Sequence, residues 1–105
     1  MISAIIAAVD ATIQMGNIEE PFRSVTKAIM DRTAGLLFVS SESIEAGKSV
    51  AEHGMGSLIA VELRSWFVLL FESAIRLLKL LNERASVSKL GAWVVKERKR
   101  KLEDR

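Results

Sequence analysis

The sequence contains no cysteine and only one histidine among its 105 residues. The absence of cysteine excludes disulfide bonds, thiolate metal sites and a cysteine nucleophile. It suits a reducing compartment without proving one. A single histidine, His53, cannot build a metal cage of His and Cys ligands, and no acidic residue is evident that would orient it toward Ser57 in a hydrolytic triad. We therefore expect neither a metal centre nor a hydrolase, and we interpret His53 as a polar loop residue.

Long apolar runs and a phosphate-binding loop are also absent. The unbroken apolar stretches 4–9 and 66–71 are far shorter than the ~18 residues that a membrane span requires. No basic residue opens a secretory signal after Met1, and Asp10 interrupts the first apolar segment. The tripeptide 54–56 is too short for a P-loop and lacks its lysine. We expect a soluble, cytoplasmic protein without a membrane partner.

The formal net charge is only +2. The surface as a whole is therefore not positive enough to bind a polyanion such as nucleic acid. The basic residues gather at the end of the chain, in Lys96, Arg98, Lys99, Arg100, Lys101 and Arg105. Such a run is typical of a solvated helix end or tail. The alternative is a non-catalytic helical interaction module, or a nucleic-acid-binding module, that uses residues 96–101.

The single proline and the six glycines divide the chain. Residues 2–15 are rich in Ala and Ile and favour a helix that stops near Gly16 and Asn17. We interpret residues 1–18 as a linker or an extra N-terminal helix rather than as core. Pro21 suits the first turn of a helix, and apolar residues then recur at spacings of three and four, which predicts a helix over 21–38.

Residues 39–56 are rich in Ser, Glu and Gly and predict a long loop. Long loops in compact domains are often functional. Ile44 and Val50 are isolated apolar residues within this segment, and we expect them to hold the loop against the core.

The second half of the chain predicts further helices. Ser57 follows Gly54 and Gly56 and is interpreted as the N-cap of a helix. The apolar stretch 66–81 must turn near residues 71–74, and it is either core or a surface for dimerisation. A last helix is expected from Ser86 or Ser88 to Arg98, with a basic tail at 99–105. Its inner stripe is Val87, Leu90, Trp93 and Val94.

No two-residue alternation persists anywhere, so the pattern predicts an all-α fold. We expect a small four-helix bundle of the acyl-carrier type with a long loop between its first two core helices. Gly91 lies inside the last helix, where it either costs ~1 kcal/mol relative to alanine or permits close packing.

Ser57 is the residue with the clearest chemical potential. Its hydroxyl is expected to be exposed, because Gly54, Met55 and Gly56 give it little bulky cover. A phosphodiester on this oxygen would lie against the free N–H groups and the positive dipole end of a helix. From spacing alone, a simple capping role for Ser57 remains the alternative. Met55 either fills the loop or touches a partner.

The segment 53–67 closely resembles the phosphopantetheine attachment segment of carrier domains in fungal highly reducing (type I, iterative) polyketide synthases. The family pattern is Gly, an apolar residue, Asp, Ser, Leu, and then a run similar to Val-Ala-Val-Glu-Leu-Arg-Asn-Trp. This chain supplies Gly54, Met55, Ser57, Leu58, Ala60, Val61, Glu62, Leu63, Arg64 and Trp66. Segments 44–50 and 85–92 resemble the same family more loosely.

This resemblance implies an acyl carrier domain over residues 19–98, excised from a larger synthase and monomeric on its own. Ser57 would receive 4′-phosphopantetheine from coenzyme A through a phosphopantetheinyl transferase. The cofactor's thiol would then hold the growing polyketide as a thioester. The domain itself would be non-catalytic, would present the acyl intermediate to the ketosynthase, acyltransferase and reductive domains, and would bind no nucleic acid. One departure stands out, because Gly56 occupies the position where the family usually has Asp.

Overall fold

The computed structural model describes residues 4–72 and 74–104. Within these ranges the chain is all-helical, and β-structure is limited to an isolated bridge between Ser49 and Ser86. The α-helices are α1 (Ala4–Gln14), α2 (Glu19–Leu37), α3 (Ser57–Phe71), α4 (Leu77–Leu80) and α5 (Val87–Glu103). Two 3₁₀ turns, η1 (Ser41–Ser43) and η2 (Ala51–His53), lie in the long loop between α2 and α3. The predicted all-α fold is confirmed.

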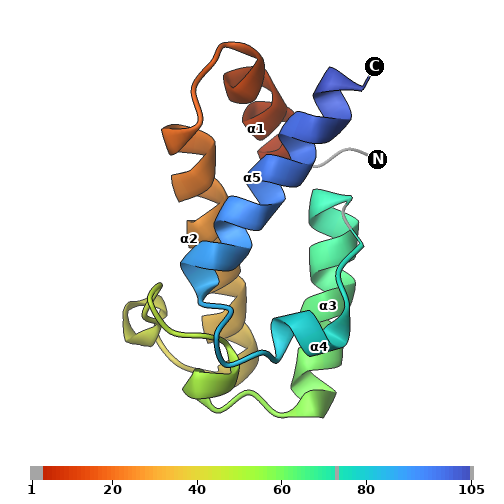
Figure 1. Ribbon diagram of the computed structural model, residues 1–105. Coiled ribbons are helices and arrows are strands. Elements are labelled where there is room, and N and C mark those ends of the chain that lie inside the picture. Colours follow the sequence, from red (N-terminus) through yellow and green to blue (C-terminus); the bar gives the residue numbers. More distant parts are fainter. Residues whose placement is uncertain (1–3, 73, 105) are drawn as a thin grey trace.

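Helices α2 and α5 form the centre of the molecule, and α5 crosses in front of α2 in Figure 1. The stripe predicted on α2 is confirmed, since Val25, Ile29 and Thr33 are buried. On α5, Val87, Leu90 and Val94 are likewise buried, while Trp93 is half-buried. Of the two alternatives left open for Gly91, the structure supports close packing, because a Cβ at this position would lie 2.1 Å from Thr26 Oγ1.

Residues 1–18 were interpreted as a linker or an extra N-terminal helix rather than as core. The structure has a helix here, α1, and one face of it is part of the core. Its residues Ile6, Val9 and Ile13 recur on one face and are buried. That face packs against α2 and α5 (Figure 1). The apolar composition of residues 4–14 therefore reflects burial. The start of the carrier domain at residue 19 stays a prediction.

The apolar stretch 66–81 turns where the sequence predicted. Helix α3 ends at Phe71, and Glu72 takes a left-handed conformation with φ 52°. The rings of Phe67 and Phe71 meet edge-to-face at 4.9 Å between centroids. Trp66 packs edge-on to Phe71 at 5.4 Å. Phe67 and Phe71 are part of the core, and the half-buried Trp66 packs against it.

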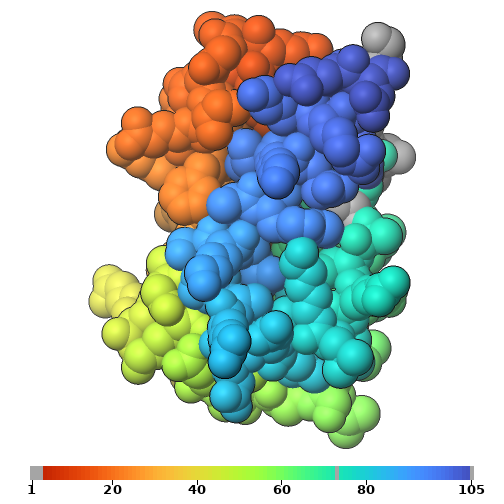
Figure 2. Space-filling view, viewed as in Figure 1, coloured from red at the N-terminus to blue at the C-terminus, as the bar shows by residue number. Residues whose placement is uncertain are grey.

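Helix α5 extends further than the sequence predicted. It begins after Ser86, whose hydroxyl accepts a hydrogen bond from the Lys89 N–H at 3.2 Å, and it ends at Glu103 rather than near Arg98. Ion pairs between successive turns support the added residues, as between Arg100 and Glu97 at 3.0 Å. Residues 99–103 are thus helix and not a tail. Figure 2 shows this helix running over the surface between the N-terminal helices and α4.

Candidate functional site

Ser57 lies at the start of α3 with an exposed side chain, as predicted. Its assignment as the N-cap was wrong by one residue. Gly56 is the N-cap, in an extended conformation (φ −81°, ψ 170°), and its carbonyl accepts the first helical hydrogen bond from the Ala60 N–H at 2.9 Å. The N–H groups at the start of α3 therefore have no acceptor within the helix, as at any helix N-terminus.

The backbone on either side of Met55 is open, whereas Met55 itself is buried. A Cβ built at Gly54 or at Gly56 would meet nothing within 4 Å. Met55 is only 5% exposed and packs in the hydrophobic core, which supports the loop-filling interpretation over partner contact. The Met55 side chain thus anchors a segment that otherwise leaves the approach to Ser57 uncovered.

The loop that leads to Ser57 is held by a reciprocal pair of hydrogen bonds between Ser49 and Glu52. The Ser49 N–H donates to Glu52 Oε1 at 3.0 Å, and the Glu52 N–H donates to Ser49 Oγ at 3.1 Å. The reciprocal Ser-x-x-Glu pair has the pattern of a capping box, here one residue before Val50, the N-cap of η2. The bond from the Ser49 N–H lowers the pKa of the Glu52 carboxyl. The Ser-x-x-Glu spacing was readable in the sequence but was missed there.

His53 closes the same loop through both ring nitrogens. Nδ1 bonds to the carbonyl oxygen of Ser49 at 2.7 Å, and Nε2 accepts the Glu45 N–H at 2.9 Å. This pair of bonds requires the neutral ring with its proton on Nδ1. The loop-residue interpretation of His53 is confirmed, and with both nitrogens bound to backbone the ring offers no free base for Ser57.

The core holds the loop from the other side. Ile44 and Val50 are buried, as the sequence predicted. The N–H groups of Val87 and Ser88 donate to the carbonyls of Lys48 and Ala46, both at 2.9 Å. The loop is therefore fixed to the start of α5 before it reaches Ser57.

The surface next to Ser57 is apolar. Leu58 is 88% exposed and Val61 is 49% exposed, although both are large hydrophobic residues. The first turn of α3 contains no acidic residue. An anion on Ser57 would thus meet helix N–H groups and aliphatic side chains rather than a neighbouring carboxylate.

The basic segment 96–101 does not form a continuous cationic face. The Arg98 side chain is 5% exposed, and its guanidinium binds both carboxylate oxygens of Asp10, at 2.6 and 3.0 Å. That hydrogen bonding raises the pKa of Arg98. Arg100 hydrogen-bonds to Glu97 and lowers the pKa of its carboxyl. This internal pairing counts against the nucleic-acid alternative.

The apolar stretch 66–81 is mostly core, which also weakens a role in dimerisation. Phe67, Phe71 and Leu80 are fully buried, and within this stretch Leu69 and Leu78 are the large apolar side chains that lie exposed. Over the described residues, no helix is both long and apolar enough to cross a bilayer. The same residues contain no group of three or more His, Cys, Asp or Glu side chains that would hold a metal ion.

Comparison with known proteins gives a consistent set of relatives. The chain is 38% identical over 71 residues (68% of this chain) to the prosolanapyrone synthase of Alternaria solani. It is 34% identical over 80 residues (76% of this chain) to the highly reducing polyketide synthase xilA of Penicillium rubens. It is 48% identical over 42 residues (40% of this chain) to the squalestatin tetraketide synthase clz2 of Cochliobolus lunatus.

The chain spans only 2–3% of the length of these relatives. No family model matches the sequence. No solved structure matches it either.

Proposed function

We propose that this chain, whose homologues are fungal highly reducing polyketide synthases, is an acyl carrier domain that bears 4′-phosphopantetheine on Ser57. The observation that carries the proposal is the exposed Ser57 hydroxyl at the start of α3, inside the segment that resembles the carrier attachment sequence. The domain would be non-catalytic and would hold the growing polyketide for the catalytic domains of the same synthase.

The residues around Ser57 fit a phosphodiester. The free N–H groups and the positive end of the α3 dipole favour an anion at this position. No acidic side chain lies in the first turn to oppose it. Gly54 and Gly56 leave space on the side from which the group would arrive, since a Cβ at either position would meet no neighbour.

Attachment would be a phosphoryl-group transfer carried out by a separate transferase. The Ser57 Oγ would form a bond to the pantetheine-side phosphorus of coenzyme A. The pyrophosphate P–O bond would break, adenosine 3′,5′-bisphosphate would leave, and the hydroxyl proton would pass to a base of the transferase. The attached group would supply the thiol for thioester formation, which this cysteine-free chain lacks.

The chain's own contribution would be position and contact. The bonds of Ser49, Glu52 and His53 would keep the loop in one shape while α3 presents Ser57 at its exposed end. The exposed Leu58 and Val61 would give the transferase and the ketosynthase, acyltransferase and reductive domains an apolar surface beside the attachment point. A short tether to such domains raises the effective concentration of the acyl group to about millimolar.

The test is the intact mass of the folded chain after incubation with coenzyme A and a promiscuous phosphopantetheinyl transferase. We expect a gain of one phosphopantetheinyl group, located on Ser57 by peptide fragmentation. Ser57→Ala should abolish the gain, whereas Ser65→Ala, which removes an exposed hydroxyl further along α3, should leave it unchanged. Both variants should remain folded by circular dichroism.

Two results would refute the proposal. One is an unchanged mass for the folded, initially unmodified protein under conditions that load a control carrier. The other is a group attached at a serine other than Ser57.

A further inference from the structure

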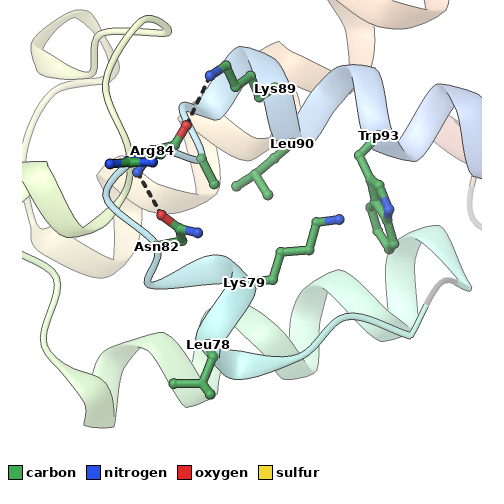
Figure 3. Close-up of a pocket in the computed structure, with 8 residues that line it drawn as sticks. Leu78, Lys79, Asn82, Arg84, Lys89, Leu90 and Trp93 are labelled. Carbon is green, nitrogen blue, oxygen red and sulfur yellow. Dashed lines mark hydrogen bonds between the residues drawn. The ribbon is translucent and has the colours of Figure 1, made fainter.

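A second surface feature lies away from the loop of Ser57, between α4 and the first turns of α5 (Figure 3). It is an open cleft of about 570 Å³. Its apolar lining comes from Leu78, Leu90 and Trp93. Lys79, Arg84 and Lys89 also line it, and no acidic residue does. An apolar floor with a purely cationic set of charges is a distinctive combination in a chain whose net charge is only +2.

Two of the three cationic side chains, Lys79 and Lys89, have contacts that hold them at the cleft without neutralising their charge. Lys79 Nζ lies 4.3 Å from the centroid of the Trp93 ring, in a cation–π contact. Lys89 Nζ donates to the carbonyl oxygen of Arg84 at 3.2 Å (Figure 3). The Arg84 N–H donates in turn to Asn82 Oδ1 at 2.8 Å, which fixes the loop between the two helices.

None of these three side chains forms an ion pair with another described residue, unlike Arg98, Lys99 and Arg100 further along α5. Two acidic residues lie nearby without lining the cleft: Glu97, whose carboxyl is hydrogen-bonded by Arg100, and the exposed Glu83, which precedes Arg84 and forms no ion pair with Lys79, Arg84 or Lys89 among the described residues. The positive charge of the cleft is therefore available to a ligand.

We propose that this cleft binds an acidic segment of a partner protein that inserts an apolar side chain against Leu78 and Trp93. Charge complementarity sets the sign of the partner, because three unpaired cations surround the apolar surface. Leu78 is 81% exposed, so the cleft is open at this wall and would leave a small molecule largely in water. A chain segment covers such a surface more completely. The proposal rests on α4 and α5 and is independent of the role of Ser57.

The probe is a short synthetic peptide, acetyl-Glu-Asp-Leu-Phe-Asp-Glu-amide, titrated into the ¹⁵N-labelled full chain at low salt. The chain has two tryptophans, so its spectrum carries two indole N–H signals that a Trp66→Phe variant assigns. We expect the Trp93 signal and the backbone signals of Leu78, Arg84 and Lys89 to shift saturably. The Trp66 signal should stay in place, and added salt should weaken the binding.

Two double variants change the net charge of the chain by the same amount, one inside the cleft and one outside it. Arg84→Glu combined with Lys89→Glu should weaken the peptide's affinity about tenfold, because two attractions become repulsions. Arg32→Glu combined with Lys96→Glu alters two exposed cations outside the cleft and should change the affinity less than about twofold. If the first double variant is unfolded, Arg84→Gln with Lys89→Gln serves in its place, with a smaller loss expected.

The peptide in which Gln and Asn replace Glu and Asp should bind at least tenfold more weakly. Equal losses in the two charge variants, or shifts spread over the whole surface, would overturn the proposal in favour of non-specific attraction. Saturable shifts of the Trp93 signal by hexanoate but not by the acidic peptide would overturn it in favour of a small carboxylate site.

Discussion

At the scale of single residues, two roles that one capping serine often combines are divided between neighbours at the start of α3. Gly56 supplies the backbone conformation that begins α3, while Ser57 supplies the hydroxyl one residue later. Because Gly56 has no side chain, its position provides no capping oxygen for the N–H groups of the first turn. Those N–H groups remain available to an anion on Ser57. At the position where the resembling family has Asp, Gly56 provides neither a side chain nor a charge.

Replacing Gly56 by Asp tests this separation. The residue already has extended backbone angles that any amino acid adopts, and a Cβ would meet nothing within 4 Å. An aspartate here caps the helix and faces its positive end, so we expect a gain of about 0.5 kcal/mol in the free energy of unfolding. Urea denaturation followed by circular dichroism measures the change.

Gly54→Asp provides the control in the same loop. Gly54 has φ +88°, which strains other residues, so this variant should be less stable than the parent protein. Gly56→Asn keeps the cap without the charge and should retain part of the gain. A lower unfolding midpoint for Gly56→Asp than for the parent would contradict the assignment of Gly56 as the N-cap.

The sequence predicted the exposure of Ser57 but not the bonds that position it. Exposure followed from neighbours with little bulk, which is a local property. His53 binds the backbone of Ser49 and Glu45, and these partners come together only when the loop has folded. A sequence pattern gives the order of the side chains, so it does not predict hydrogen bonds from a side chain to distant backbone groups.

At the scale of secondary-structure elements, the contact of α2 with α5 is the most extensive among the described residues. Periodicity predicted the buried stripes on both helices, because side chains three and four residues apart share a face. It did not predict that Thr26 and Gly91 would face each other across the contact. Thr26 Oγ1 is buried without a hydrogen-bond partner among the described residues. Thr26 and Gly91 therefore contribute to the contact by their fit in size and not by a hydrogen bond.

Gly91→Ala separates packing from helix propensity. Propensity alone would stabilise α5 by ~1 kcal/mol in the alanine variant. The added Cβ would instead lie 2.1 Å from Thr26 Oγ1 and 3.2 Å from Thr26 Cβ, so the Thr26 side chain must rotate or the helices must move apart. We expect a net loss of about 1–3 kcal/mol in the free energy of unfolding, measured by chemical denaturation.

Adding Thr26→Ala to Gly91→Ala should recover part of that loss, because the nearest clashing atom is removed. The two substitutions should therefore be clearly non-additive. A Gly91→Ala variant at least as stable as the parent would show that α2 and α5 do not approach this closely.

At the scale of the whole molecule, α1 and α5 join the two ends of the chain. The Arg98–Asp10 pair spans 88 positions in the sequence, and Ile6, Val9 and Ile13 add an apolar contact around it. The Cα radius of gyration is 13.2 Å, near the ~13 Å typical of a single compact unit of about 100 residues. The sequence could not show this connection, because Arg98 stands within a basic run and nothing local marks its partner.

Asp10→Ala measures how much of the fold depends on that connection. The variant leaves the Arg98 guanidinium buried with Glu72 as its remaining acidic neighbour, at 3.9 Å, so we expect a loss of about 3 kcal/mol in the free energy of unfolding. Arg23→Ala removes an exposed pair with Glu19 and should change stability by less than about 1 kcal/mol. Asp10→Leu combined with Arg98→Met buries no unpaired charge and should recover most of the loss. If Asp10→Ala lowered the free energy of unfolding no more than Arg23→Ala, the Arg98–Asp10 pair would contribute little to stability. A large loss that the double variant repairs would instead show that α1 unfolds in one cooperative unit with α5.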